Sequence, residues 1–198
     1  QVAAAEAVNL PVILQLSQNA VKYHHGWLNP IGSAVLKLAE QAKVPVVAHL
    51  DHAEDLDLCR AAVDLGFTSI MYDGSKLPDA QNRDTTAQIT QWCHDRGVSV
   101  EAELGEVGGK NGVHDPSART NPEDAAKFVA DTGVDLLAVA VGSSHAMTSR
   151  DATLDTELIS AIKQAVPVPL VLHGSSGVSD EGMRAAIKAG MTKINVST

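Results

Sequence analysis

Three histidines occupy the same place relative to three separate apolar runs. His52 ends a run that begins at Val44, and His145 and His173 end two later runs of the same kind. Parallel strands that are covered on both faces read as continuous aliphatic runs, and α/β barrels carry their reactive residues at the C-terminal ends of the strands. Three imidazoles at one rim can supply the nitrogen ligands of a catalytic zinc and leave a position open. The pattern predicts a zinc site made of these histidines.

A fourth histidine, His49, shares a strand face with Asp51, because side chains alternate across a strand. We expect it to be a structural histidine of the rim. Each of the three candidate zinc ligands could also be a separate histidine satisfied by its own neighbours. Their common place at strand ends favours the shared ion.

Carboxylates accompany these histidines. Asp51 precedes His52, so we expect it to face the same cavity and to transfer protons. Glu103, counted as catalytic, could be an alternate oxygen ligand, a partner of a ligating imidazole or a carboxylate paired elsewhere in the rim. Asp73 and Glu101 also end strands. We expect both to orient ligands or a loop, and we count Asp73 among the candidate metal ligands.

Gly- and Ser-rich turns follow the last two apolar runs and predict an anion site. Glycines let backbone amides approach an anion closely, and hydroxyls and helix N-termini add donors without net charge. Barrels commonly bind phosphate in the loops after strands seven and eight. The candidate substrate-binding and phosphate-binding residues are Ser17, Gly174, Ser175, Ser176, Asn195, Ser197 and Thr198.

Strand-like and helix-like segments alternate along the whole chain. The predicted strands cover residues 12–17, 44–52, 68–72, 98–105, 136–145, 168–172 and 193–196, and the predicted helices cover residues 31–43, 55–65, 79–96, 121–132, 154–165 and 180–189. The steps are near the thirty residues of a βα unit. We therefore predict an α/β fold, a (β/α)8 TIM barrel that forms a single catalytic domain over residues 1–198.

The chain is short for such a barrel, which typically needs about 250 residues. We expect it to be a fragment that lacks the first strand and the C-terminal helices. A doubly wound open sheet is the structural alternative, although no strand is followed by a glycine-rich dinucleotide-binding fingerprint.

The charge balance limits the possible partners. The formal net charge is -9, and Lys and Arg form no cluster, which argues against a nucleic-acid or anionic-membrane surface. No apolar run approaches the ~20 residues of a membrane span, and no signal peptide is evident, so we expect a soluble, cytoplasmic protein. Cys59 and Cys93 lack the spacings of disulfide frameworks or thiolate metal sites, and we expect both to be buried.

Six motifs, in order along the chain, resemble those of the class II, metal-dependent fructose-bisphosphate and tagatose-bisphosphate aldolases. The motifs are His49-Leu50-Asp51-His52, Asp73-Gly74-Ser75, Glu101-Ala102-Glu103-Leu104-Gly105, the strand ending in His145, His173-Gly174-Ser175-Ser176-Gly177 and Asn195-Val196-Ser197-Thr198. The resemblance implies a Zn2+ held by the three histidines, with Glu103 as the ligand used when a histidine swings away. It also implies that Asp51 is the acid/base acting on the hydroxyl where the carbon–carbon bond breaks.

The resemblance further implies a phosphorylated sugar substrate. The phosphate of dihydroxyacetone phosphate would lie on Gly174, Ser176, Ser197 and Thr198, with Asn195 beside the reacting carbons and a monovalent cation, Na+ or K+, assisting. Fructose 1,6-bisphosphate is the expected substrate, with tagatose bisphosphate or a deoxy-ketose phosphate as alternatives. A homodimer or homotetramer is expected, with no nucleic-acid or membrane partner.

Two segments depart from the family pattern. The second zinc histidine is usually followed by glycine and often soon by an aromatic residue, whereas Ala146 follows it here and Arg150 could offer a charged fork to phosphate. In the loop over residues 106–119, the Gly-Gly pair is followed by Lys110 instead of the common acids. Glu106, His114 or Asp115 could substitute for them.

Two alternative functions stay open. An imine-forming aldolase would need a lysine in the cavity, but we expect Lys193 to precede its strand and Lys76 to lie past a turn. A catalytically degenerate barrel could serve as a metal-binding or assembly module. The altered loop makes that alternative plausible.

Overall fold

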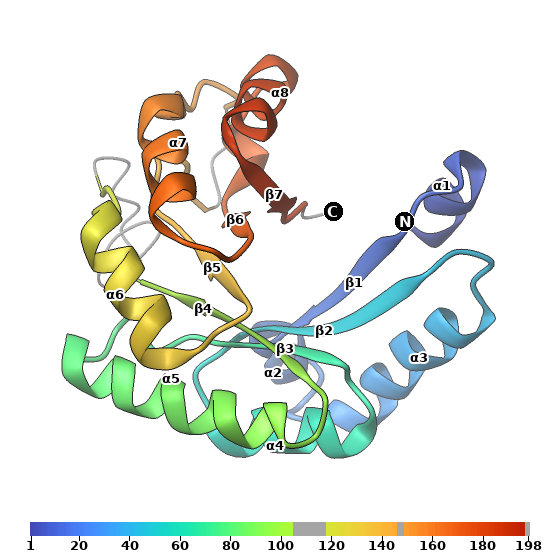
Figure 1. Cartoon of the computed structure of the whole chain (residues 1–198). Helices are drawn as coiled ribbons and strands as arrows, with labels where there is room; N and C mark the ends of the chain where they lie inside the picture. The colour runs from blue at the N-terminus through green and yellow to red at the C-terminus, as the bar shows by residue number, and fades with distance from the viewer. Residues whose placement is uncertain (105–117, 146–148, 197–198) are drawn as a thin grey trace. The chain divides into compact units, whose positions relative to one another are not determined.

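Strands and helices alternate along the computed structural model, which describes residues 1–104, 118–145 and 149–196 (Figure 1). The strands are β1 (Val12–Ser17), β2 (Val46–Ala53), β3 (Ser69–Tyr72), β4 (Ser99–Glu103), β5 (Leu136–Ala138), β6 (Leu170–Leu172) and β7 (Met191–Ile194). The helices are α1 (Val2–Val8), α2 (Gln18–Tyr23), α3 (Leu28–Gln41), α4 (Leu56–Leu65), α5 (Asp79–His94), α6 (Pro122–Thr132), α7 (Thr156–Ala165) and α8 (Asp180–Ala189), with a 3-10 turn, η2, over Ser175–Gly177.

The sheet keeps the order of the sequence. Strands β1 to β7 are hydrogen-bonded each to the next, and the β1–β2, β2–β3, β5–β6 and β6–β7 pairs are parallel. Parallel neighbours joined by helical crossovers are the βα repeat that the sequence predicts. The carboxyl ends of the strands therefore carry the loops where we expect the functional residues.

The chain divides into two compact units. Unit 1 comprises Gln1–Asp73 and Ile89–Glu101, and unit 2 comprises Gly74–Gln88 and Ala102–Thr198. Strand β4 contributes to both, with residues 99–101 in unit 1 and residues 102–103 in unit 2.

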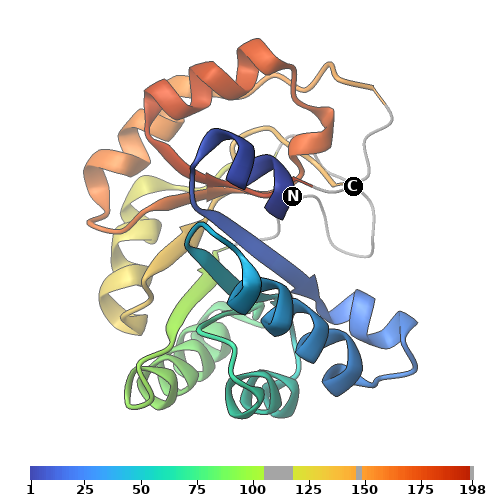
Figure 2. The same ribbon diagram turned by 90° about the vertical axis from the view of Figure 1, so that its right-hand side faces the viewer.

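In unit 1, helices cover strands whose aliphatic side chains form the core. Helix α3 packs on β1 and β2, as Figure 2 shows, and α4 packs on β2 and β3. Leu50 and Ile70, partners in the β2–β3 register, are fully buried. Asp55 caps the start of α4, and Gly66, at φ 117°, ends the helix in the left-handed conformation that glycine adopts most readily. Local signals therefore set the bounds of the helix, and burial sets its face.

In unit 2, α6 packs on α7 and α7 packs on α8. The Asn121 side chain accepts the backbone N–H groups of Glu123 and Asp124 at the start of α6, with Pro122 in the first turn. Such a cap satisfies donors that have no partner inside the helix. The core beneath these helices is aliphatic, with Ile159 and Leu170 fully buried.

Several predicted bounds are wrong. Helix α3 begins at Leu28 instead of residue 31, because Pro30 falls within the first turn, where a missing N–H costs no hydrogen bond. The last strand covers residues 191–194 instead of 193–196, since the chain passes directly from Gly190 into β7. Lys193 thus lies inside the strand, where it is buried, and Asn195 follows it.

Both cysteines are buried, as predicted. None of the described helices combines the length and the apolarity that crossing a membrane requires.

Candidate active site

A β-bulge shapes the carboxyl end of β2 in unit 1. Leu50 pairs with Ile70 and Ala53 pairs with Tyr72. Between these two pairs, β2 contains one residue more than β3. His52 lies within this bulge at φ 47°, a conformation that non-glycine residues rarely adopt. Bulges interrupt strand alternation and re-aim side chains near functional sites. The bulge explains how the adjacent Asp51 and His52 can both serve one site.

The bulge brings His52 against Asp73. Its Nδ1 donates to Asp73 Oδ2 at 2.9 Å, and its side chain keeps 28% of its surface exposed. A carboxylate on one ring nitrogen orients an imidazole so that the other nitrogen can bind a metal. Asp73 was expected to orient a ligand or a loop, and this contact is the one through which it would orient His52.

Earlier on β2, His49 lies in a buried polar cluster. Its Nδ1 is 2.8 Å from Ser69 Oγ, and its Nε2 is 3.9 Å from Asp51 Oδ1 and 3.7 Å from Glu101 Oε2. The imidazole and both carboxylates are buried. The sequence interpretation placed His49 on the face of Asp51, but it missed the contacts with Ser69 and Glu101.

In unit 2, two of the predicted zinc histidines are neighbours. The His145 and His173 ring centroids are 5.8 Å apart, with the planes at 77°. His173 directly follows β6, and Asn195 Nδ2 donates to its Nε2 at 3.3 Å. The strand predicted to end in His145 is shorter than expected, because β5 ends at Ala138 and His145 lies in the loop that follows. Unit 2 therefore groups two candidate ligands with the asparagine that was predicted to lie beside the reacting carbons.

Gly174 lets the loop after β6 pass close to the loop after β5. Its φ is +66°, and a Cβ there would lie 2.5 Å from the carbonyl carbon of Ser144. Only glycine tolerates this approach. The buried Ser175 Oγ donates to the Asn195 carbonyl, so it joins the two predicted phosphate-binding turns, whereas Ser176 is exposed.

Two buried hydroxyls lie in the loop after β5. Ser143 and Ser144 are 3% and 1% exposed, and neither Oγ has a hydrogen-bond partner among the residues that the structure describes. Buried polar atoms are nearly always satisfied by protein or water. The buried segment before His145 therefore carries polar side chains.

The remaining predicted residues have these places. Ser17 caps α2 by accepting the Ala20 N–H at 3.1 Å. Glu103 is buried at the end of β4, and its backbone oxygen accepts from the buried Asn82 side chain at 3.3 Å. Asn82 was missed because it lies on a helix, away from every motif. Ser197, Thr198 and residues 105–117 and 146–148 lie outside the described residues.

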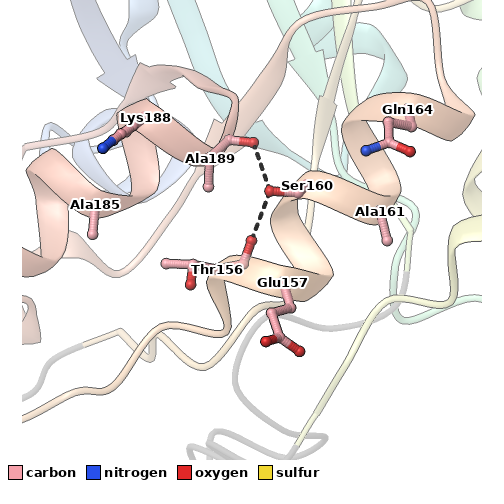
Figure 3. A pocket seen from close by; sticks show the side chains of 8 residues that line it. All are labelled: Thr156, Glu157, Ser160, Ala161, Gln164, Ala185, Lys188 and Ala189. Atoms are coloured by element: carbon pink, nitrogen blue, oxygen red, sulfur yellow. Dashed lines mark hydrogen bonds between the residues drawn. The ribbon is translucent and has the colours of Figure 1, made fainter.

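Two cavities lie away from these side chains. One of about 590 Å³ lies between α7 and α8, where Ser160 donates to the carbonyls of Thr156 and Ala189 (Figure 3). The other, of about 370 Å³, is lined by residues that include Gln18, Lys22 and Asp55. Neither is lined by a residue that the sequence predicted to be functional.

The donor chemistry of the two units fits zinc. Zinc prefers imidazole nitrogen with carboxylate oxygen as a further ligand, and ligating histidines usually donate their second nitrogen to a carboxylate or a carbonyl. Unit 1 offers a carboxylate-oriented histidine, and unit 2 offers a neighbouring pair of histidines.

The chain matches one family model and many known proteins. The model described as "Fructose-bisphosphate aldolase class-II" matches residues 1–198. A fructose-bisphosphate aldolase of Geobacillus stearothermophilus is 40% identical over 200 residues, which cover 99% of this chain and 69% of that protein. A 6-phospho-5-dehydro-2-deoxy-D-gluconate aldolase of Shouchella clausii is 39% identical over 198 residues, which cover 99% of this chain and 68% of that protein.

Solved structures agree with these matches. The crystal structure of the YdjI aldolase from Escherichia coli K12 superposes with a TM-score of 0.84 at 34% identity, covering 100% of this chain and 69% of that one. Together with the family match, this likeness confirms the predicted α/β barrel class.

Proposed function

The chain belongs to the class II fructose-bisphosphate aldolase family, and from this premise we propose that it cleaves a ketose phosphate into dihydroxyacetone phosphate and an aldehyde. Fructose 1,6-bisphosphate is the first candidate substrate, with glyceraldehyde 3-phosphate as the aldehyde product. The observation that carries the proposal is the set of contacts that the three candidate histidines make. His52 is oriented by Asp73, and His145 lies beside His173.

We propose that His52, His145 and His173 bind zinc, with Glu103 as the alternate oxygen ligand. Asp73 would hold His52 through the 2.9 Å contact, and it remains a candidate ligand itself. When bound, zinc supplies positive charge that stabilises the negative charge left on the carbonyl oxygen after cleavage. The two compact units would then act as one catalytic domain.

Asp51 is the proposed acid/base. In the cleavage direction, its carboxylate takes the proton from the hydroxyl on the carbon whose bond breaks. In the reverse direction it returns that proton. Its side chain keeps 11% of its surface exposed, whereas the neighbouring His49 and Glu101 keep 1% and 0%, so Asp51 is the member of this group that a substrate could reach.

The phosphate would lie on the turn after β6. Gly174 lets that backbone pass close to its neighbours, and the exposed Ser176 hydroxyl can donate to a bound oxygen. Ser17, Ser175, Asn195, Ser197 and Thr198 complete the proposed substrate-binding set. We also propose a monovalent cation, Na+ or K+, near the phosphate, and a homodimer or homotetramer working in the cytoplasm.

A second substrate class has comparable support. The Shouchella clausii relative, named as an aldolase for a deoxy-gluconate phosphate, is 39% identical to this chain, close to the 40% of the Geobacillus enzyme. The aldehyde half of the substrate distinguishes the two.

The test is a cleavage assay with added zinc over ketose mono- and bisphosphates, including 6-phospho-5-dehydro-2-deoxy-D-gluconate. We expect cleavage of at least one substrate, loss of activity with a chelator, and recovery with zinc or cobalt. Borohydride added with substrate should trap no adduct. A chelator-resistant enzyme that borohydride labels at the buried Lys193 would overturn the proposal in favour of imine chemistry.

The alternative of a catalytically degenerate barrel predicts a different outcome of this assay. It predicts zinc binding without turnover on every substrate of the panel. Measurable turnover that Asp51→Ala abolishes while zinc content stays at the native level would exclude it.

A further inference from the structure

The imidazole of His49 lies between two carboxylates inside unit 1. Its Nε2 is 3.7 Å from Glu101 Oε2 and 3.9 Å from Asp51 Oδ1. These separations are longer than hydrogen bonds but within the range of ion pairs, and the contact with Glu101 joins strand β2 to strand β4 within the buried interior. Of these three buried side chains, Asp51 is the most exposed, at 11% against 1% for His49 and 0% for Glu101. The cluster therefore leads from a fully buried acid, through the imidazole, to the carboxylate that is closest to solvent.

The opposite side of the ring is held as well. His49 and Ser69 are register partners on β2 and β3, and Ser69 Oγ lies 2.8 Å from Nδ1. When the serine hydroxyl donates to Nδ1, the ring proton is on Nε2, the nitrogen that faces both carboxylates. Side chains on β2, β3 and β4 thus surround the ring of His49.

We propose that His49 is a positioning residue that holds the carboxylate of Asp51 in its reactive orientation. The inference rests on the proposed role of Asp51 as the acid/base. A catalytic group works only when its geometry is maintained by partners that are themselves fixed, and losing such a partner lowers turnover more than substrate binding. His49 is too deeply buried to touch the substrate, so it acts through Asp51.

The main competing explanation for the cluster is a metal ion of its own. One ligand atom from each of His49, Asp51 and Glu101 lies within 4.8 Å of the others. A metal at this place would make His49 a ligand, and its loss would remove an equivalent of metal. The positioning role predicts no change in metal content.

The experiment compares four variants of the full chain with the native protein, using the best substrate of the panel and saturating zinc. His49→Gln keeps an N–H donor near the place of Nε2, whereas His49→Phe keeps the ring volume without the donor. Ser69→Ala removes the hydroxyl that fixes the ring. Ser99→Ala is the matched control, because it removes a hydroxyl on β4 that donates to the Thr68 carbonyl instead of to His49.

We expect His49→Phe to lower kcat by about 100-fold and Ser69→Ala by about 10-fold, with KM within about 3-fold of the native value, by analogy with the loss of outer-sphere partners. His49→Gln should recover most of the kcat that His49→Phe loses. Zinc content should match the native protein in every variant, and Ser99→Ala should keep native kcat. If His49→Phe fails to fold, His49→Gln and Ser69→Ala still measure the effect through the split between kcat and KM.

Three outcomes contradict the proposal. If Ser69→Ala and either of the two His49 variants, each tested as a single variant, keep native kcat, Asp51 needs no such support. A lost equivalent of metal in the His49 variants would replace the positioning role with a second metal site. A native protein that cleaves no ketose phosphate would overturn the proposed function first, and this inference with it.

Discussion

Asp51 and His52 are adjacent in the chain yet have different neighbours. Asp51 faces His49, whereas His52 contacts Asp73, and the bulge with φ 47° at His52 allows both. An unbroken strand would send neighbouring side chains to opposite faces. The local strain at His52 is therefore what gives this rim both a candidate base and a candidate metal ligand.

At the residue scale, Asp51→Asn tests the acid/base role. The amide keeps the size of the side chain but cannot accept a proton, so we expect kcat to fall by about 10²- to 10⁴-fold with zinc content unchanged. Steady-state kinetics and metal analysis measure the two quantities. Asp57→Asn, on the exposed face of α4, is the matched control and should keep native kcat. A kcat within a few-fold of native for Asp51→Asn would exclude the role.

Asp73→Ala tests the orientation of His52. Without the 2.9 Å contact the imidazole loses the partner on Nδ1, so we expect zinc affinity to fall by about 10- to 100-fold. Competition with a chelating dye measures this affinity without any substrate. Asp64→Ala, an exposed carboxylate on α4, serves as the control. Unchanged zinc affinity in Asp73→Ala would show that the contact does not support a metal ligand.

At the scale of elements, helices α4 and α5 bring two buried thiols near each other. Burial, and then the neighbouring Cys93, raises the pKa of the Cys59 thiol from 9.0 to about 12. The folded state thus keeps the Cys59 proton to higher pH than the unfolded chain does. Its contribution to stability is complete below pH 9 and is lost as the pH rises from 9 towards 12.

Urea unfolding of the native protein and Cys59→Ala at several pH values tests this linkage. We expect the native protein to be the more stable of the two below pH 9, because the variant leaves a cavity, and the difference to shrink as the pH rises above 9. Groups common to both proteins cancel in the comparison. A difference in unfolding free energy that stays constant with pH would contradict the raised pKa.

The segment after residue 148 is hydrogen-bonded to the residues that follow η2. Arg150 donates to Asp180 at 2.7 Å and to the Val178 carbonyl at 3.0 Å. Its guanidinium thus contacts the segment next to the proposed phosphate turn. The sequence suggested that Arg150 offers a charged fork to phosphate, whereas in the structure its guanidinium contacts Asp180 and the Val178 backbone beside the proposed phosphate turn.

Arg150→Ala should therefore affect substrate binding more than turnover. Exposed ion pairs contribute little, so we expect KM for the phosphorylated substrate to rise by about 2- to 5-fold with kcat nearly native. Asp180→Asn should reproduce the effect, and the double variant should add little to it. Arg60→Ala, which breaks the exposed pair with Asp57, is the control. A large loss of kcat would mean that Arg150 acts on the reacting atoms instead.

At the scale of the whole molecule, the proposed metal links folding to binding. A ligand that binds only the folded state stabilises it, by about 2.7 kcal/mol at one hundred times Kd. Zinc should therefore raise the Tm of the metal-stripped protein in thermal scans. This shift should be lost in His145→Ala and kept in His94→Ala, which removes a histidine of α5 with no candidate role. A Tm that zinc leaves unchanged would contradict the proposed metal site.

The sequence alone indicated the βα alternation, because the signals for each element are local. Helix α8 covers residues 180–189 as predicted, since Ser179 caps its start and Gly190 follows its end. The candidate histidines could be found for the same reason, since each closes an apolar run. The family resemblance, carried by six short motifs, was confirmed by the family match.

Only the tertiary structure decided which side chains meet. Glu101 is 52 positions from His49, and Asn82 reaches the backbone of Glu103 from a helix, so neither contact leaves a trace in local spacing. The bulge at His52 depends on the register with β3, which no residue of β2 reveals by itself. Periodicity and capping depend on neighbours a few residues apart, whereas orientation within the site depends on packing between distant strands.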